Sequence, residues 1–149
     1  MEVTTLQTSS ILAPAAVLIL WSMIILFWMV ATRFPALKKA RMSLSAAKAG
    51  TRYQDIEAQL PDSINWKSHN YTHLMEQPTL FYAVVIILAL VGEDTNLNFG
   101  LAWTYVLLRI AHSLWQILVN TLNVRIPLFA LSSLCLTGLA INAVRATLF

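Results

Sequence analysis

Charged residues are scarce in this sequence. Only 11% of its 149 residues are Asp, Glu, Lys or Arg, whereas 58% are hydrophobic. A water-soluble domain usually carries about 25% charged residues. The mean hydropathy of +0.66 points in the same direction. The scarcity of charge therefore argues against an ordinary soluble domain and favours an integral membrane protein.

Cysteine is almost absent, and basic residues are missing ahead of the first apolar run. The single cysteine, Cys135, excludes an intrachain disulfide framework and is interpreted as a small buried hydrophobe. Glu2 is the only charged residue before the apolar run at residues 11–31. A signal peptide would carry a basic segment there and a shorter apolar core. We therefore expect this run to remain as a membrane anchor.

Long apolar runs predict the fold. The run at residues 11–31 has the length of about 20 residues that spans a bilayer. A second apolar run, residues 79–91, is too short to span alone, so the polar residues 69–76 are predicted to form the first turns of its helix. The predicted spanning helices cover about residues 11–32, 66–92, 97–122 and 126–148. The expected fold is an all-α integral membrane protein, a four-transmembrane-helix bundle forming a single domain over residues 1–149.

The distribution of basic residues predicts the orientation in the membrane. Lys and Arg gather in the loop at residues 33–65, whereas the loop at residues 92–98 has none. By the positive-inside rule, the loop 33–65 and Arg125 are predicted to be cytoplasmic, with both termini on the opposite side. A basic loop beside a membrane helix is typical of a topology signal in contact with membrane lipid. We expect lipid and no nucleic acid as its partner.

Two polar stripes interrupt the apolar helices. At about 100° per residue, one stripe falls within an arc of roughly 100° on the third predicted helix. It comprises Arg109, His112, Ser113, Gln116, Asn120 and Asn123. The second stripe, on the second predicted helix, comprises His69, His73 and Glu76. Counting 1.5 Å per residue places Glu76 and Arg109 at similar depths, which predicts a buried ion pair between them.

Three interpretations of these stripes remain open. The polar residues could lock the bundle, or they could line a polar cavity open to the cytoplasm with Arg125 at its mouth. Intramembrane ionisable residues favour the functional interpretation. A metal site formed by His69, His73 and Glu76 with His112 is the rival hypothesis. It is disfavoured because Arg109 and Arg125 would repel a cation, so no metal is expected.

The same residues resemble the MAPEG superfamily, the membrane-associated proteins in eicosanoid and glutathione metabolism. The segment 70–81 is similar to the family's second-helix motif, in which a Glu is followed by Pro and Phe. The matching positions are Glu76, Pro78 and Phe81, and then Arg109-x-x-His112-Ser113 followed by Arg125. The resemblance implies a homotrimer that binds glutathione as co-substrate between subunits, near the cytoplasmic face.

The resemblance also assigns roles to individual residues. Arg125 matches the arginine that stabilises the glutathione thiolate and is the expected catalytic residue. The expected glutathione-binding residues are His69, His73, Glu76, Arg109, His112 and Gln116. This set suits the ligand independently, because glutathione carries two carboxylates and an amine, and guanidinium groups bind carboxylates and lower the pKa of a nearby thiol. Arg33 or Lys38 of a neighbouring chain could also reach the tripeptide.

Three departures from the family pattern affect the predicted activity. His69 stands where enzymatic relatives have arginine, His73 where they have asparagine, and Gln116 where the related synthase has tyrosine. The leading hypothesis is a glutathione transferase or peroxidase-like enzyme that acts on apolar electrophiles from the bilayer. The alternative is a non-catalytic membrane scaffold or lipid-binding protein with the same fold. A transporter is disfavoured, because discontinuous helices at mid-membrane are not indicated.

Overall fold

The computed structural model describes residues 10–41, 48–52 and 54–149. Within these ranges the regular elements are helices: α1 (Leu12–Lys39), α2 (Gln54–Glu57), α3 (Asp62–Leu90), α4 (Asn96–Leu118) and α5 (Leu122–Leu148). The prediction of an all-helical chain is confirmed for this part of the protein. The short helix α2 lies within the loop that the sequence analysis left without structure.

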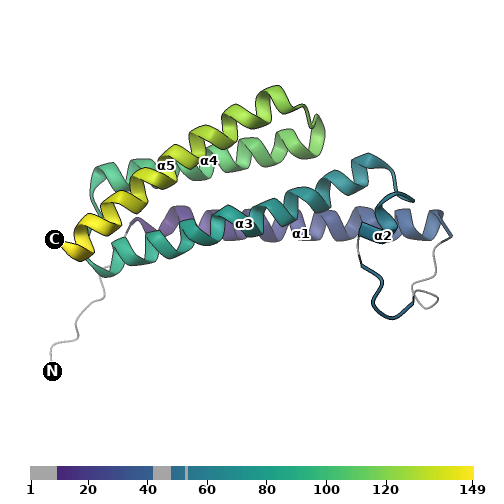
Figure 1. The fold of residues 1–149 in the computed structure, drawn as a ribbon, viewed down its shortest axis with the longest axis horizontal. Helices are drawn as coiled ribbons and strands as arrows, with labels where there is room; N and C mark the ends of the chain where they lie inside the picture. Colours follow the sequence, from purple (N-terminus) through teal and green to yellow (C-terminus); the bar gives the residue numbers. More distant parts are fainter. Residues whose placement is uncertain (1–9, 42–47, 53) are drawn as a thin grey trace.

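The long helices are arranged as two pairs. Helices α1 and α3 run side by side, and α4 and α5 form a second pair joined by a tight turn (Figure 1). Helix α3 also packs against both α4 and α5, and α1 packs against α4. The C-terminus lies at the end of the bundle that carries the α3–α4 turn, and α2 lies at the other end (Figure 1). Polar side chains on α3, α4 and α5 can therefore meet between the two pairs.

The surface of the bundle is apolar along much of its length. By length and composition, three helices in the described ranges could cross a membrane: α1, α3 and α5. Their outward residues include the exposed Leu20, Leu80 and Leu134. Helix α4, predicted as a fourth span, is not among the three, because it carries Asn, Arg, His and Gln side chains along its length. Most of these polar side chains face the interior, where Arg109 and Gln116 are buried.

Helix α1 continues seven residues beyond its predicted end at residue 32. The extension is held against α3, because Arg33 Nη1 donates a hydrogen bond of 2.9 Å to Ser68 Oγ and Leu37 is buried. Helix α3 in turn begins at Asp62, earlier than predicted, directly after Pro61. Both differences lengthen the end of the bundle that carries the basic loop.

The predicted third helix is interrupted at Asn120. Helix α4 ends at Leu118, and Asn120 adopts a left-handed backbone conformation with φ of 60°. Asparagine tolerates this conformation better than most residues. Trp115 fixes the turn, since its carbonyl accepts from the Asn120 amide at 2.8 Å and its indole N–H donates to Thr121 Oγ1 at 3.0 Å. Arg125, predicted to lie in the loop between the third and fourth helices, lies in the first turn of α5, because α5 begins at Leu122 and not at residue 126.

Candidate functional site

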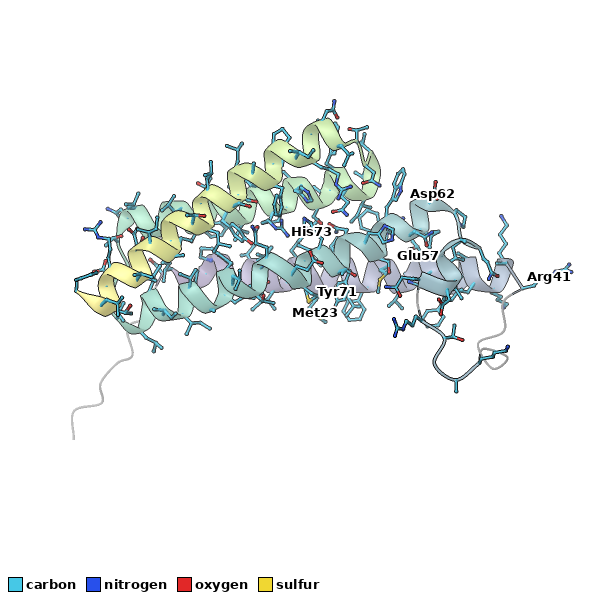
Figure 2. The ribbon with its side chains drawn as sticks, viewed as in Figure 1. Met23, Arg41, Glu57, Asp62, Tyr71 and His73 are labelled. Atoms are coloured by element: carbon cyan, nitrogen blue, oxygen red, sulfur yellow. The ribbon has the colours of Figure 1, made fainter. Side chains whose placement is uncertain are left out.

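A small hollow lies where α3, α4 and the start of α5 meet. Its volume is ≈ 190 Å³. It is lined by His73, His112, Leu122, Arg125, Ile126 and Phe129, and is termed here the histidine hollow. His73 lies on the side of α3 that faces the α4–α5 pair (Figure 2). Three of the predicted site residues, His73, His112 and Arg125, thus come together from three helices.

Phe129 forms an aromatic wall of the histidine hollow. Its ring centroid lies 5.4 Å from that of His73 and 6.4 Å from that of His112, and the two imidazole centroids are 5.0 Å apart. The Arg109 guanidinium carbon lies 5.8 Å from the same ring, in cation–π geometry. The sequence analysis did not identify Phe129, although its spacing of four residues from Arg125 places both on one face of a helix.

Arg109 is a buried cation with few partners. The residue is 1% exposed, and its Nη2 donates a hydrogen bond of 2.9 Å to the backbone carbonyl of His73. Pro78, in the same stretch of α3, lacks the amide hydrogen that would otherwise bond the Leu74 carbonyl, so the continuous helix lacks one backbone hydrogen bond beside this contact. The Nε and Nη1 groups of Arg109 have no hydrogen-bond partner among the described residues.

The predicted ion pair between Glu76 and Arg109 is wrong. Glu76 Oε2 lies 3.1 Å from His73 Nδ1, and its side chain is 64% exposed. Counting residues gave the depth of both groups along the bundle but not the rotation of α3 about its axis. Glu76 therefore pairs with His73 and is largely exposed, and no ion pair joins it to Arg109 among the described residues.

Arg125 is the second guanidinium of the site. Its Nη1 donates a hydrogen bond of 2.7 Å to Asn120 Oδ1, so the left-handed turn that reverses the chain also positions this side chain. The Nε group has no partner among the described residues. No carboxylate lines the histidine hollow. The hollow thus carries Arg125 at its wall and Arg109 behind Phe129, without an acidic side chain in its lining.

A junction of three helices lies beside the hollow. Ser113 Oγ accepts hydrogen bonds from Trp21 Nε1 at 3.0 Å and from Asn70 Nδ2 at 2.7 Å. This contact ties α4 to α1 and α3 and so fixes the rotation of α4 about its axis. The same rotation positions His112, next to Ser113, and Gln116, one turn further along. The side-chain amide oxygens Asn70 Oδ1 and Gln116 Oε1 are buried and lack partners in the described part of the chain. Gln116 does not line the histidine hollow, and Asn70 was not singled out from the sequence.

His69 lies outside the histidine hollow. Its Nε2 is 2.7 Å from Glu57 Oε1 on α2, and its side chain is 49% exposed. Asn65 reinforces the same contact by donating from Nδ2 to the Glu57 carbonyl at 2.9 Å. His69 therefore pairs with the segment before α3 and not with the polar residues of α4. Within the described ranges, no group of three His, Cys, Asp or Glu side chains could hold a metal ion.

Comparison with known proteins identifies the class to which this helical bundle belongs. Three apolar helices in the described ranges are long enough to cross a membrane, and a hollow lined in part by histidine and arginine lies between α3, α4 and α5. The family model described as the MAPEG family matches residues 11–145, and the chain belongs to this family. It is therefore an integral membrane protein of a family associated with eicosanoid and glutathione metabolism. Neither the curated proteins nor the solved structures include a match.

Proposed function

We propose that this protein binds glutathione and acts as a glutathione transferase or peroxidase-like enzyme on apolar electrophiles from the bilayer. The observation that carries the proposal is the buried Arg109 guanidinium, whose Nε and Nη1 have no partner in the part of the chain that the structure describes. A buried cation is costly unless an anion and hydrogen-bond acceptors compensate it. Glutathione offers two carboxylates and a thiolate, which are suitable acceptors for the guanidinium groups of Arg109 and Arg125.

The proposed chemistry depends on the thiolate form of glutathione. A guanidinium close to the sulfur lowers the pKa of the thiol, and Arg125 is the arginine on the wall of the histidine hollow. In a transfer reaction the thiol releases its proton to solvent and the sulfur forms a bond to an electrophilic carbon. The leaving group departs with the pair of electrons that bound it. Arg109, behind the Phe129 wall, serves to bind and orient the peptide.

The size of the hollow supports a site completed by a second copy of the chain. Ligand pockets usually enclose about 300–1,000 Å³, which exceeds the ≈ 190 Å³ of the histidine hollow. We propose a homotrimer, as the family resemblance implies, in which a neighbouring chain closes the site. Arg33 donates to Ser68 of its own chain, which leaves the exposed Lys38 as the better candidate to reach a neighbour. The mass of the protein in micelles, measured by light scattering, tests the trimer.

The proposed membrane arrangement retains four spanning helices. Helix α4 has 23 residues, which corresponds to about 34 Å and exceeds the hydrocarbon thickness of about 30 Å. Its exposed residues include Leu107, Leu114 and Leu118, which suit a lipid-facing side. We propose that residues 33–65 and Arg125 lie on the cytoplasmic side. Labelling of single introduced cysteines with an impermeant reagent tests this orientation.

Glutathione binding and turnover are measured separately. Ligand binding raises the melting temperature, and a hundredfold excess over Kd stabilises a protein by about 2.7 kcal/mol. We expect glutathione to stabilise the purified protein and glutathione conjugation of 1-chloro-2,4-dinitrobenzene, or reduction of a lipid hydroperoxide, to be detectable. Arg125→Ala should abolish turnover with folding unchanged. Absence of both glutathione binding and turnover in the parent protein would refute the proposal.

A non-catalytic scaffold or lipid-binding protein is the second candidate. It is favoured by the position of His69, which pairs with Glu57 outside the hollow, and by Gln116, which offers no hydroxyl group where the synthase has tyrosine. In this case glutathione could bind without turnover, and Arg125→Ala would leave the measured properties unchanged. Turnover that depends on Arg125 would exclude this candidate.

A further inference from the structure

Helix α1 is longer than a membrane requires. Its 28 residues correspond to about 42 Å, whereas the hydrocarbon core is about 30 Å thick. Trp28 lies near the point where the apolar run ends, and Lys67 Nζ is 5.7 Å from the centre of its ring. Tryptophan and lysine are typical residues of the membrane interface. The last turns of α1, from Arg33 onward, therefore extend from the interface into the headgroup region.

This extension is a fixed part of the bundle. One side is attached to α3 through the hydrogen bond from Arg33 to Ser68 and through the burial of Leu37. Because that side is engaged, the orientation of the opposite side is determined. The residues on the opposite side are held in place and presented outward.

The outward side combines an aromatic ring with cations. Phe34 is 57% exposed, and Lys38, Lys39 and Arg41 are exposed as well. At about 100° per residue, Phe34, Lys38 and Lys39 fall within an arc of roughly 140°. Arg41 follows directly, at the far end of α1 and away from Glu57 and Asp62 (Figure 2). This set of four residues is termed the basic face.

The basic face has no acidic partner in the described ranges. No ion pair joins Lys38, Lys39 or Arg41 to a carboxylate. Two acidic residues of the neighbouring segment are engaged elsewhere, Glu57 with His69 and Asp55 with the backbone amide of Arg52. The third, Asp62, lies away from Arg41 at the start of α3 (Figure 2). The positive charge of the basic face is therefore available to an external anion.

We propose that the basic face binds the headgroups of anionic phospholipids, with Phe34 inserted at the boundary of the acyl chains. Basic clusters directly beside a membrane helix attract anionic lipids, at about fivefold in affinity for each cation near the surface. An aromatic side chain at the same level favours a lipid over a free phosphate or a nucleic acid, because it gains from contact with hydrocarbon. The basic face shares no residue with the lining of the histidine hollow.

The test uses the full chain in micelles with defined added lipid. Native mass spectrometry counts the retained molecules of phosphatidylglycerol and of phosphatidylcholine, and the melting temperature is measured for each lipid. Lys39→Gln/Arg41→Gln removes two charges of the basic face and leaves Lys38 intact, because Lys38 is the candidate to reach a neighbouring glutathione site. Lys48→Gln/Arg52→Gln is the matched control, since it removes two exposed charges outside α1. Phe34→Ser tests the aromatic contribution separately.

We expect phosphatidylglycerol to be retained in preference to phosphatidylcholine by the parent protein. The affinity for phosphatidylglycerol should fall about 25-fold in Lys39→Gln/Arg41→Gln and less than fivefold in the control. High salt should weaken the binding of phosphatidylglycerol to the parent protein as well. An equal fall in both double variants would refute a specific basic face. Equal stabilisation by inorganic phosphate, or no effect of Phe34→Ser, would refute the lipid as the ligand. Melting in phosphatidylcholine alone shows that each variant is folded.

Discussion

Asn98 and Arg109 lie on the same helix, and both residues are 1% exposed, yet their surroundings differ. Both polar atoms of the Asn98 side chain have a partner, since its Nδ2 donates to the Glu93 carbonyl at 2.9 Å and its Oδ1 accepts from Asn142 Nδ2 at 2.7 Å. The Arg109 side chain donates one hydrogen bond, to the His73 carbonyl, and two of its nitrogens have no partner in the described ranges. Burial of a polar group therefore does not by itself indicate a binding site. Buried polar atoms without a hydrogen-bond partner are the better indication of a binding site.

The same contrast extends to the neighbours of the two residues. Close to Asn98, Ser10 donates from its backbone N–H and its hydroxyl to the carboxylate of Asp94. Among the described residues, further unpartnered buried atoms occur on Asn70, Tyr82, Gln116 and Arg125. A few unsatisfied groups are usual in a folded protein, but here Arg109 alone contributes two of them, and Arg125 contributes another at the wall of the histidine hollow. We infer that the Asn98 region stabilises the fold and that the Arg109 region is built for a ligand.

Replacing Arg109 should have the largest effect on ligand binding. Arg109→Met removes the guanidinium, and each charge-assisted hydrogen bond contributes about 1.5–3 kcal/mol, so loss of two should weaken glutathione binding at least about 100-fold. The melting temperature without glutathione should change little, because Nε and Nη1 of the guanidinium have no partner to lose among the described residues. Thermal shift measured against glutathione concentration tests this prediction. The control is Arg145→Met, which removes an exposed arginine from the far end of α5.

Replacing Asn98 should have the opposite result. Asn98→Leu removes both hydrogen bonds of the Asn98 side chain, and each hydrogen bond contributes about 0.5–1.5 kcal/mol. We expect a loss of about 2 kcal/mol in the free energy of unfolding and an unchanged affinity for glutathione. Denaturation in micelles and the same thermal shift measure the two quantities. A protein that remained stable but no longer bound glutathione would contradict the comparison.

The sequence predicted those features that depend on the apolar environment. Runs of apolar residues located α1, α3 and α5, because a spanning segment must satisfy its backbone internally and present apolar side chains to lipid. The short motifs around Glu76 and Arg109 were sufficient to predict the family, which the match over residues 11–145 confirms. His73, His112 and Arg125, named from the sequence, are the polar lining of the hollow.

The features that could not be predicted from the sequence depend on the rotation of each helix about its own axis and on contacts between residues far apart in the sequence. A depth count paired Glu76 with Arg109, but the rotation of α3 directs Glu76 toward His73 and the exterior. Helix periodicity continued the stripe through Asn120, where one left-handed residue ends it. His69 shares a helical face with His73, yet a contact with Glu57 on a separate segment decides its environment. Single-sequence periodicity contains none of this information.

Replacing Arg125 should affect the reaction more than the binding of glutathione. In the proposed mechanism the Arg125 guanidinium lowers the pKa of the glutathione thiol, so Arg125→Gln should raise that pKa. At pH values below the pKa, the thiolate fraction should then fall by about tenfold for each unit by which the pKa rises. Turnover of 1-chloro-2,4-dinitrobenzene should therefore fall at neutral pH and recover as the pH rises. The dependence of kcat/KM on pH measures the shift. A fall of equal size at every pH would assign Arg125 a role other than stabilising the thiolate.

Replacing His69 should have the smallest effect and would define the boundary of the site. The contact between His69 and Glu57 is partly exposed, and such pairs contribute about 0–1 kcal/mol to stability. We expect His69→Gln to change the affinity for glutathione by less than about twofold, whereas His73→Gln, at the wall of the hollow, should weaken it several-fold more. Titration calorimetry on both variants makes the comparison. If His69→Gln weakened binding as much as His73→Gln, the site would have to include α2, and the segment bearing Glu57 would take part in binding glutathione.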